Sequence, residues 1–90
     1  MTTVDRYHKG MVLGPNDVYI GRPGKWGNPF VMKKEEDRQF VIDRFIAWLA
    51  TGGAPYNLED IKRELKGKRL LCWCHPKACH GDVLAKLADS

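Results

Sequence analysis

Residues 70–84 read Leu-Leu-Cys-Trp-Cys-His-Pro-Lys-Ala-Cys-His-Gly-Asp-Val-Leu. A short apolar run leads into a polar loop that contains all three cysteines of the chain, and a helix-like pattern follows. We expect a strand at Leu70–Cys74 and a helix from Gly81 or Asp82 to Ala88. In α/β proteins, ligands bind where a strand is followed by a helix. The segment therefore predicts a site, although it does not identify a reaction.

Two more helices are predicted upstream of this segment. The apolar spacing at 35–50 is typical of an amphipathic helix, and we expect Phe40, Phe45 and Trp48 to lie in the core. Asn57 is a good N-cap for a shorter helix that ends before Gly67.

The predicted strands complete a small α/β fold. Val18–Ile20 is bounded by turn residues and reads as a strand, and a second short strand is expected within Val4–Leu13. The element order is β-β-α-α-β-α with about three helices, which predicts a single α/β domain over residues 1–90 with a short, partly parallel sheet. A right-handed crossover would bring the loops after Val18–Ile20 and Leu70–Cys74 to the same sheet edge.

Composition limits the class of protein. The 90 residues are 43% apolar and carry a formal net charge of +4, which is compatible with a folded chain and with a phosphate-bearing partner. Three cysteines cannot all pair, and no signal peptide or long apolar run is visible. We therefore expect a cytoplasmic protein with reduced thiols and no membrane partner.

One interpretation of the Cys-His loop is a catalytic cluster of Cys79, His80 and Asp82. They lie at the start of the last predicted helix, where unpaired N–H groups, including that of Gly81, and the positive end of the helix dipole favour a thiolate or a bound anion. His80 would serve as a base or orienting group for Cys79. Asp82 would accept from helix N–H groups or from a substrate.

Two other interpretations of the loop remain open. A zinc site could use Cys72, Cys74 and Cys79 with either His80 or His75, because three thiolates and an imidazole satisfy tetrahedral Zn²⁺. The spacing is not a usual finger pattern, so these cysteines are candidates and no metal ligand is assigned. Alternatively, Cys72 and Cys74 are small core side chains, and the residues at the helix start only cap the helix.

A second candidate segment is the Gly-rich loop at residues 21–30. Arg22 and Lys25 offer cationic donors, Trp26 offers a stacking face and Asn28 offers a bidentate amide. This set suits a phosphorylated nucleoside or a nucleobase. Alternatively, the loop is a rigid turn in which Trp26 and Phe30 plug one end of the core, and Arg22 and Asn28 have structural roles. The loop is neither a Walker loop nor a dinucleotide-binding glycine motif.

Four segments carry a resemblance to a known family: Tyr19–Pro23, Lys25–Phe30, Gly67–Cys74 and Cys79–Leu84. Together they resemble the family called domain of unknown function 4326, whose members are small bacterial and bacteriophage proteins. The resemblance extends from about Val18 to Ala88. It implies a phage-related protein, but the family's name assigns no activity.

The Cys-His loop is also similar to the end of the family called domain of unknown function 488. That family retains counterparts of Cys72, Cys79 and His80 but lacks the Cys-x-Cys pair. The similarity favours a site built on the helix start over a metal site that needs all three thiols. Both families are associated with nucleic-acid metabolism by setting alone.

These observations predict a nucleotide or nucleobase-like ligand between the Gly-rich loop at 21–28 and the helix start at 79–82. They leave open whether the protein acts on that ligand. The alternatives are a non-catalytic protein that sequesters a ligand or binds a host protein, and a zinc-stabilised interaction module. Exposed sheet edges in such a small domain also favour a homodimer.

Overall fold

The computed structural model of the protein describes residues 1–22 and 24–90. Pro23, which belongs to the predicted Gly-rich loop and to the first family motif, lies outside the described residues. The elements in order are β1 (Thr3–Arg6), β2 (Asp17–Tyr19), a 3-10 turn η1 (Glu35–Asp37), α1 (Arg38–Ala50), α2 (Leu58–Leu65), β3 (Arg69–Cys72) and α3 (His80–Ala88). This order confirms the predicted β-β-α-α-β-α fold and its three helices.

The sheet has three strands in the order β1-β3-β2, and both pairings are parallel. Leu70 of β3 aligns with Val4 of β1 and with Val18 of β2. Leu70 and Leu71 point to opposite faces of the central strand and are both fully buried. A strand buried on both faces explains why its sequence is a continuous apolar run.

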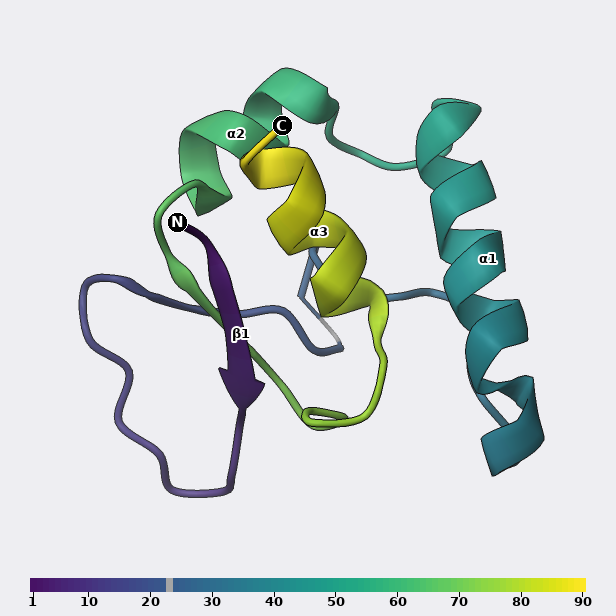
Figure 1. Ribbon diagram of the computed structural model, residues 1–90, viewed down its shortest axis with the longest axis horizontal. Coiled ribbons are helices and arrows are strands. Elements are labelled where there is room, and N and C mark those ends of the chain that lie inside the picture. Colours follow the sequence, from purple (N-terminus) through teal and green to yellow (C-terminus); the bar gives the residue numbers. More distant parts are fainter. Residues whose placement is uncertain (23) are drawn as a thin grey trace.

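The helices α2 and α3 pack together, and α3 contacts β1 and β3 (Figure 1). Val4, Val18 and Leu70 point toward this helical layer, because alternate strand residues share one face. The core between sheet and helices is completed mainly by side chains from the helices and loops, among them Ile20, Phe45, Ile61, Leu65 and Leu84.

The opposite face of the sheet carries polar and aromatic side chains. Arg69 pairs with Asp5 at 3.3 Å and with Asp17 at 2.9 Å, across all three strands. The Arg69 guanidinium holds the pKa of Asp17 below its usual value. Beyond this triad, the Tyr19 ring packs on Tyr7 with centroids 4.7 Å apart.

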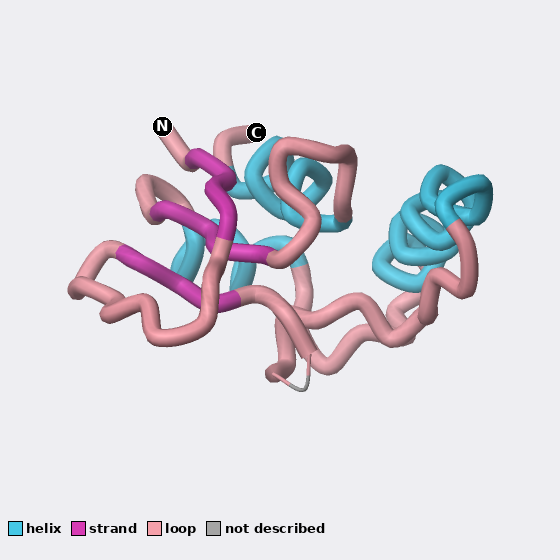
Figure 2. The backbone as a smooth tube through the Cα atoms, turned by 90° about the horizontal axis from the view of Figure 1, so that it is seen from below, coloured by secondary structure: helices cyan, strands magenta, loops and turns pink. Residues whose placement is uncertain are grey.

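Helix α1 lies to one side of the sheet and the other helices (Figures 1 and 2). It buries Ile42 and Phe45. Phe40 is 60% exposed, so the prediction that it lies in the core is wrong. It sits five residues before Phe45, roughly 140° around the helix at about 100° per residue, and cannot share its buried stripe. The guanidinium of Arg44 lies 5.7 Å from the Phe40 ring.

The two ends of the described chain are joined by hydrogen bonds. The Thr2 hydroxyl donates to Asp89 Oδ1 at 2.7 Å, and the Thr2 backbone N–H donates to Asp89 Oδ2 at 2.9 Å. The hydroxyl oxygen also accepts from the Gly67 N–H at 2.9 Å. These contacts hold β1 against the ends of α2 and α3. The Thr2 hydroxyl and then its N–H lower the pKa of Asp89.

We predict that Asp89→Asn changes the dependence of stability on acid. A carboxyl with a lowered folded-state pKa stabilises the fold above its unfolded pKa of about 3.9, and that contribution is lost as the pH falls through the folded value. Wild type should therefore be more stable than Asp89→Asn near pH 7, and the difference should shrink below about pH 4. Urea unfolding of both proteins near pH 7 and below about pH 4 measures this difference in the free energy of unfolding. If the difference is the same at both pH values, the Asp89 carboxylate does not have the role assigned to it.

Among the described residues, no helix has both the length and the apolar character required to span a membrane.

Candidate functional site

A cavity of about 370 Å³ lies where the loops after β2 and β3 meet the start of α1. Parallel pairing of β2 with β3 puts their carboxyl ends at the same sheet edge, as the crossover argument expects. The cavity is lined by Gly21, Arg22, Asn28, Phe30, Met32, Arg38, Val41, Ile42, Cys72, Trp73, Cys74, Ala78, Cys79 and His80. It therefore joins the two segments that the sequence singled out.

The start of α3 is closed by its own side chains. Cys79 is the N-cap, and its backbone N–H donates to Asp82 Oδ2 at 3.1 Å. The Gly81 N–H donates to the Cys79 sulfur at 3.3 Å. These contacts form a capping box, which satisfies N–H groups that would otherwise be free at a helix end. Gly81 and Asp82 are thus engaged within the helix start and do not line the cavity.

His80 connects α3 to the end of β2. Its Nε2–H donates to the Ile20 carbonyl at 2.8 Å, and its ring packs edge-on against Phe45 with centroids 5.2 Å apart. Burial lowers the pKa of His80, which favours the neutral imidazole. The ring nitrogen is directed to a backbone carbonyl, so His80 positions the helix start.

Two of the three cysteines form a close pair. The Sγ atoms of Cys72 and Cys79 lie 3.0 Å apart, and both residues are buried. The hydrogen bond from Cys79 lowers the pKa of Cys72 to about 6, although burial opposes the change. The same contact, together with burial, raises the pKa of Cys79. Cys74 is half-buried at the cavity wall.

The described residues contain no group of three or more His, Cys, Asp or Glu side chains arranged to hold a metal ion. Cys72, Cys74 and Cys79 all line the cavity, but they do not form such a group. The zinc interpretation therefore rests on the sequence pattern alone.

The Gly-rich loop presents Arg22 to the cavity and uses Asn28 to hold itself in place. The Asn28 amide nitrogen donates to the Val41 carbonyl at 3.2 Å, and its oxygen accepts from the Phe30 N–H at 2.9 Å. Arg22 Nη1 donates to the Asn28 carbonyl at 3.2 Å. Among the described residues, the other N–H groups of this exposed guanidinium have no partner. Arg22 is therefore the available donor of the loop.

Gly27 explains why this loop folds so tightly. A Cβ at this position would lie 3.1 Å from both the backbone N and the Cα of Arg22. A side chain at this position would therefore force the Arg22 backbone to shift by a few tenths of an ångström, which glycine avoids. The close contact with Gly27 sets the position of the Arg22 backbone beside the cavity.

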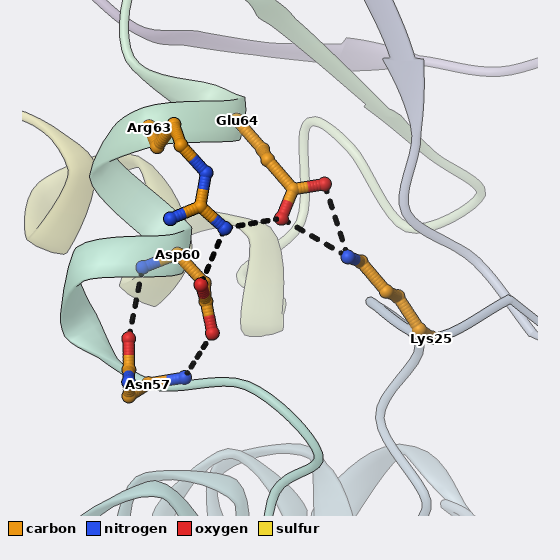
Figure 3. Close-up of polar contacts among 5 residues, drawn as sticks. All are labelled: Lys25, Asn57, Asp60, Arg63 and Glu64. Carbon is orange, nitrogen blue, oxygen red and sulfur yellow. Dashed lines mark hydrogen bonds and ion pairs between the residues drawn. The ribbon is translucent and has the colours of Figure 1, made fainter.

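Lys25 and Trp26 point away from the cavity. Lys25 Nζ pairs with Glu64 at 3.0 Å and joins the charged network of α2 (Figure 3). It also lies 4.7 Å from the centroid of the Trp26 ring. Trp26 is buried against Tyr56, with ring centroids 4.4 Å apart. Neither residue lines the cavity, although sequence reasoning assigned both to the ligand.

Arg38 is a cavity residue that sequence reasoning missed. Its guanidinium forms an ion pair with Glu35, with Nη2 and Oε2 2.8 Å apart, and Nη1 donates to the Ala78 carbonyl at 2.9 Å. Glu35 raises the pKa of Arg38 above its usual value, and the neighbouring Cys74 adds to this effect. Nothing in the sequence marks Arg38, because its neighbours in the site come from a loop far along the chain.

Comparisons with known proteins identify a family. Residues 4–90 match the family described as Domain of unknown function (DUF4326), and the chain belongs to this family. The chain is also similar to the "Uncharacterized 12.4 kDa protein in nrdA-td intergenic region" of Enterobacteria phage T4. The two are 37% identical over 78 residues, which cover 81% of this chain and 68% of the phage protein. No solved structure matches the chain.

Proposed function

We propose that this member of the DUF4326 family binds a small nucleotide or nucleobase-like ligand in the cavity between the Gly-rich loop and the start of α3. One observation carries the proposal. The cavity is lined by two arginines, Arg22 and Arg38, and by no Asp or Glu among the described residues. A cavity with this charge at the carboxyl ends of parallel strands favours an anion.

The size and walls of the cavity suit a ligand with one charged and one flat apolar part. Its volume of about 370 Å³ falls within the range of roughly 300–1,000 Å³ found for small-molecule sites. Phe30, Val41 and Ile42 provide apolar contact area for a base. Arg22 supports the phosphate because its guanidinium is exposed and matches phosphate oxygens in a fork geometry. Arg38 adds positive charge but already pairs with Glu35.

The hydrogen bonds at the helix start support binding more than acid–base catalysis. His80 donates to the Ile20 carbonyl, and Asp82 accepts from the Cys79 N–H, so neither polar group is directed at the other. The catalytic role of Cys79, His80 and Asp82 stays a prediction. A protein that sequesters its ligand needs only the cavity and Arg22.

A titration of the isotope-labelled full chain with nucleoside monophosphates tests the proposal. We expect AMP, GMP, CMP or UMP to shift the backbone amide signals of Gly21, Arg22, Phe30, Cys74 and His80 in a saturable way. Inorganic phosphate alone should shift the Arg22 signal and bind more weakly, because it lacks contact with the apolar wall.

Signals on the far side of α2, such as those of Glu59 and Arg63, serve as the internal control and should not move. Saturable shifts confined to α2, or no shifts with any of the four nucleotides, would refute a nucleotide site in this cavity.

A further inference from the structure

Two sulfur atoms meet at the inner wall of the same cavity. Cys72 is the last residue of β3, and Cys79 is the N-cap of α3. Their Sγ atoms are 3.0 Å apart, so a small approach would reach the S–S bond length of about 2.05 Å. Both side chains are almost fully buried in the fold, yet both line the cavity. Access is therefore restricted to molecules that enter the cavity.

The surroundings of the pair divide the roles of the two sulfurs. The Cys79 S–H donates to Cys72, and this hydrogen bond, with the backbone N–H groups of His75 and Cys74, lowers the pKa of Cys72 to about 6 despite its burial. This contact favours the thiolate at Cys72 and the protonated thiol at Cys79. A thiolate beside a thiol is the arrangement that begins thiol–disulfide exchange.

We infer that Cys72 and Cys79 form a reactive dithiol that reduces a small anionic disulfide inside the cavity. The charge of the substrate follows from Arg22 and Arg38, which favour a carboxylate near the cavity wall. Its methylene groups would contact Phe30 and the neighbouring aliphatic side chains. This inference shares the cavity of the proposed function but does not depend on nucleotide binding.

The proposed thiol–disulfide exchange has two steps. The Cys72 thiolate attacks one sulfur of the substrate, the substrate S–S bond breaks, and the departing thiolate takes up a proton from water. The Cys79 thiol then loses its proton and attacks the Cys72 sulfur of the mixed disulfide, which releases the second half of the substrate as a thiolate. The protein loses two electrons and the Cys79 proton and gains a Cys72–Cys79 disulfide. The substrate takes up these two electrons, the Cys79 proton and the one proton from water, and becomes two thiols.

A pair of size-matched disulfides tests the inference. Dithiodipropionate carries two carboxylates, and cystamine carries two ammonium groups on the same short chain. The reduced full-length protein is mixed with each in the presence of a chelator, and the products are followed by intact-mass spectrometry and peptide mapping. We expect loss of two hydrogens with a disulfide mapped to Cys72–Cys79, about tenfold faster with dithiodipropionate.

Three serine variants identify the roles of the sulfurs. Cys79→Ser should stop at a mixed disulfide on Cys72, because no second thiol resolves it, and Cys72→Ser should form no protein disulfide. Cys74→Ser removes the third thiol of the cavity wall and should still form the Cys72–Cys79 disulfide. Circular dichroism shows whether each variant is folded. If a variant does not fold, the peptide map of the wild-type protein still shows which two cysteines form the disulfide.

Several results would overturn the inference. They are a first mixed disulfide on Cys74, equal rates with the two reagents, or an unchanged mass after prolonged exposure to both. Retention of one equivalent of zinc by the thiols of the purified protein would also overturn it, since the pair would then be a metal site. None of these outcomes depends on the nucleotide titration, so the two proposals fail separately.

Discussion

Replacement of Phe45 by alanine should lower the free energy of unfolding by about 3–5 kcal/mol, the usual cost of removing a buried aromatic ring. Phe45 is fully buried and packs against Trp48, with centroids 5.8 Å apart, and against the ring of His80. It is one of the two buried residues of α1, and Trp48 and Leu49 of the same helix pack against the core beside it. Because a domain is stable by only about 5–15 kcal/mol, the variant should unfold at far lower urea concentration.

Phe40→Ala is the matched control on the same helix. Phe40 is 60% exposed, so its removal leaves no cavity in the core, and we expect a change within about 1 kcal/mol. Urea unfolding followed by tryptophan fluorescence and circular dichroism compares the two variants. Equal losses of stability would mean that the burial assigned to the two faces of α1 is wrong. Phe45→Leu provides a milder change if the alanine variant does not fold.

Replacement of Arg22 by glutamine should weaken nucleotide binding by about 10- to 150-fold. A hydrogen bond to a charged group contributes about 1.5–3 kcal/mol, and each 1.4 kcal/mol corresponds to a factor of ten in Kd. Arg22 is exposed and donates to the Asn28 carbonyl through Nη1 alone among the described residues, so its other N–H groups are available. Isothermal titration calorimetry with the monophosphate that binds best measures the loss.

Two variants of the same loop make the test specific. Lys25→Gln should leave Kd nearly unchanged, because Lys25 pairs with Glu64 on α2 and does not line the cavity. Arg22→Lys should keep part of the affinity, since it retains the charge but loses the planar fork. If Lys25→Gln weakens binding as much as Arg22→Gln does, the ligand contacts the loop on its other side, and the cavity is not the site.

The order of the elements followed from local sequence patterns. Flanking turn residues marked β2, an apolar run marked β3, and the first strand was placed only within Val4–Leu13. Helical spacing marked α1 and α3, and Asn57 marked the start of α2, where it caps the Asp60 N–H at 2.9 Å. These signals are local because the backbone of a short segment limits which neighbours share a face. The meeting of the two loops also followed, since the topology rules for parallel strands leave few arrangements.

The composition of the site could be predicted only in part. Arg22 and the Cys-His loop were identified because they lie beside the strand ends that form the sheet edge. Lys25 and Trp26 carry suitable chemistry in the same loop, yet the loop turns them toward α2 and Tyr56. The direction of a side chain in an irregular loop depends on contacts with distant elements, and no periodic pattern encodes it.

The sequence by itself thus determined the fold class, the element order and the edge of the sheet at which the candidate site lies. Only the tertiary structure decided that Arg38 joins the cavity, that His80 binds the Ile20 carbonyl, and that the Cys72 sulfur rests against Cys79. The physical reason is the difference between local and long-range interactions. Propensity, capping and periodicity act within a few residues, whereas a cavity and its charge arise where segments far apart in the chain pack together.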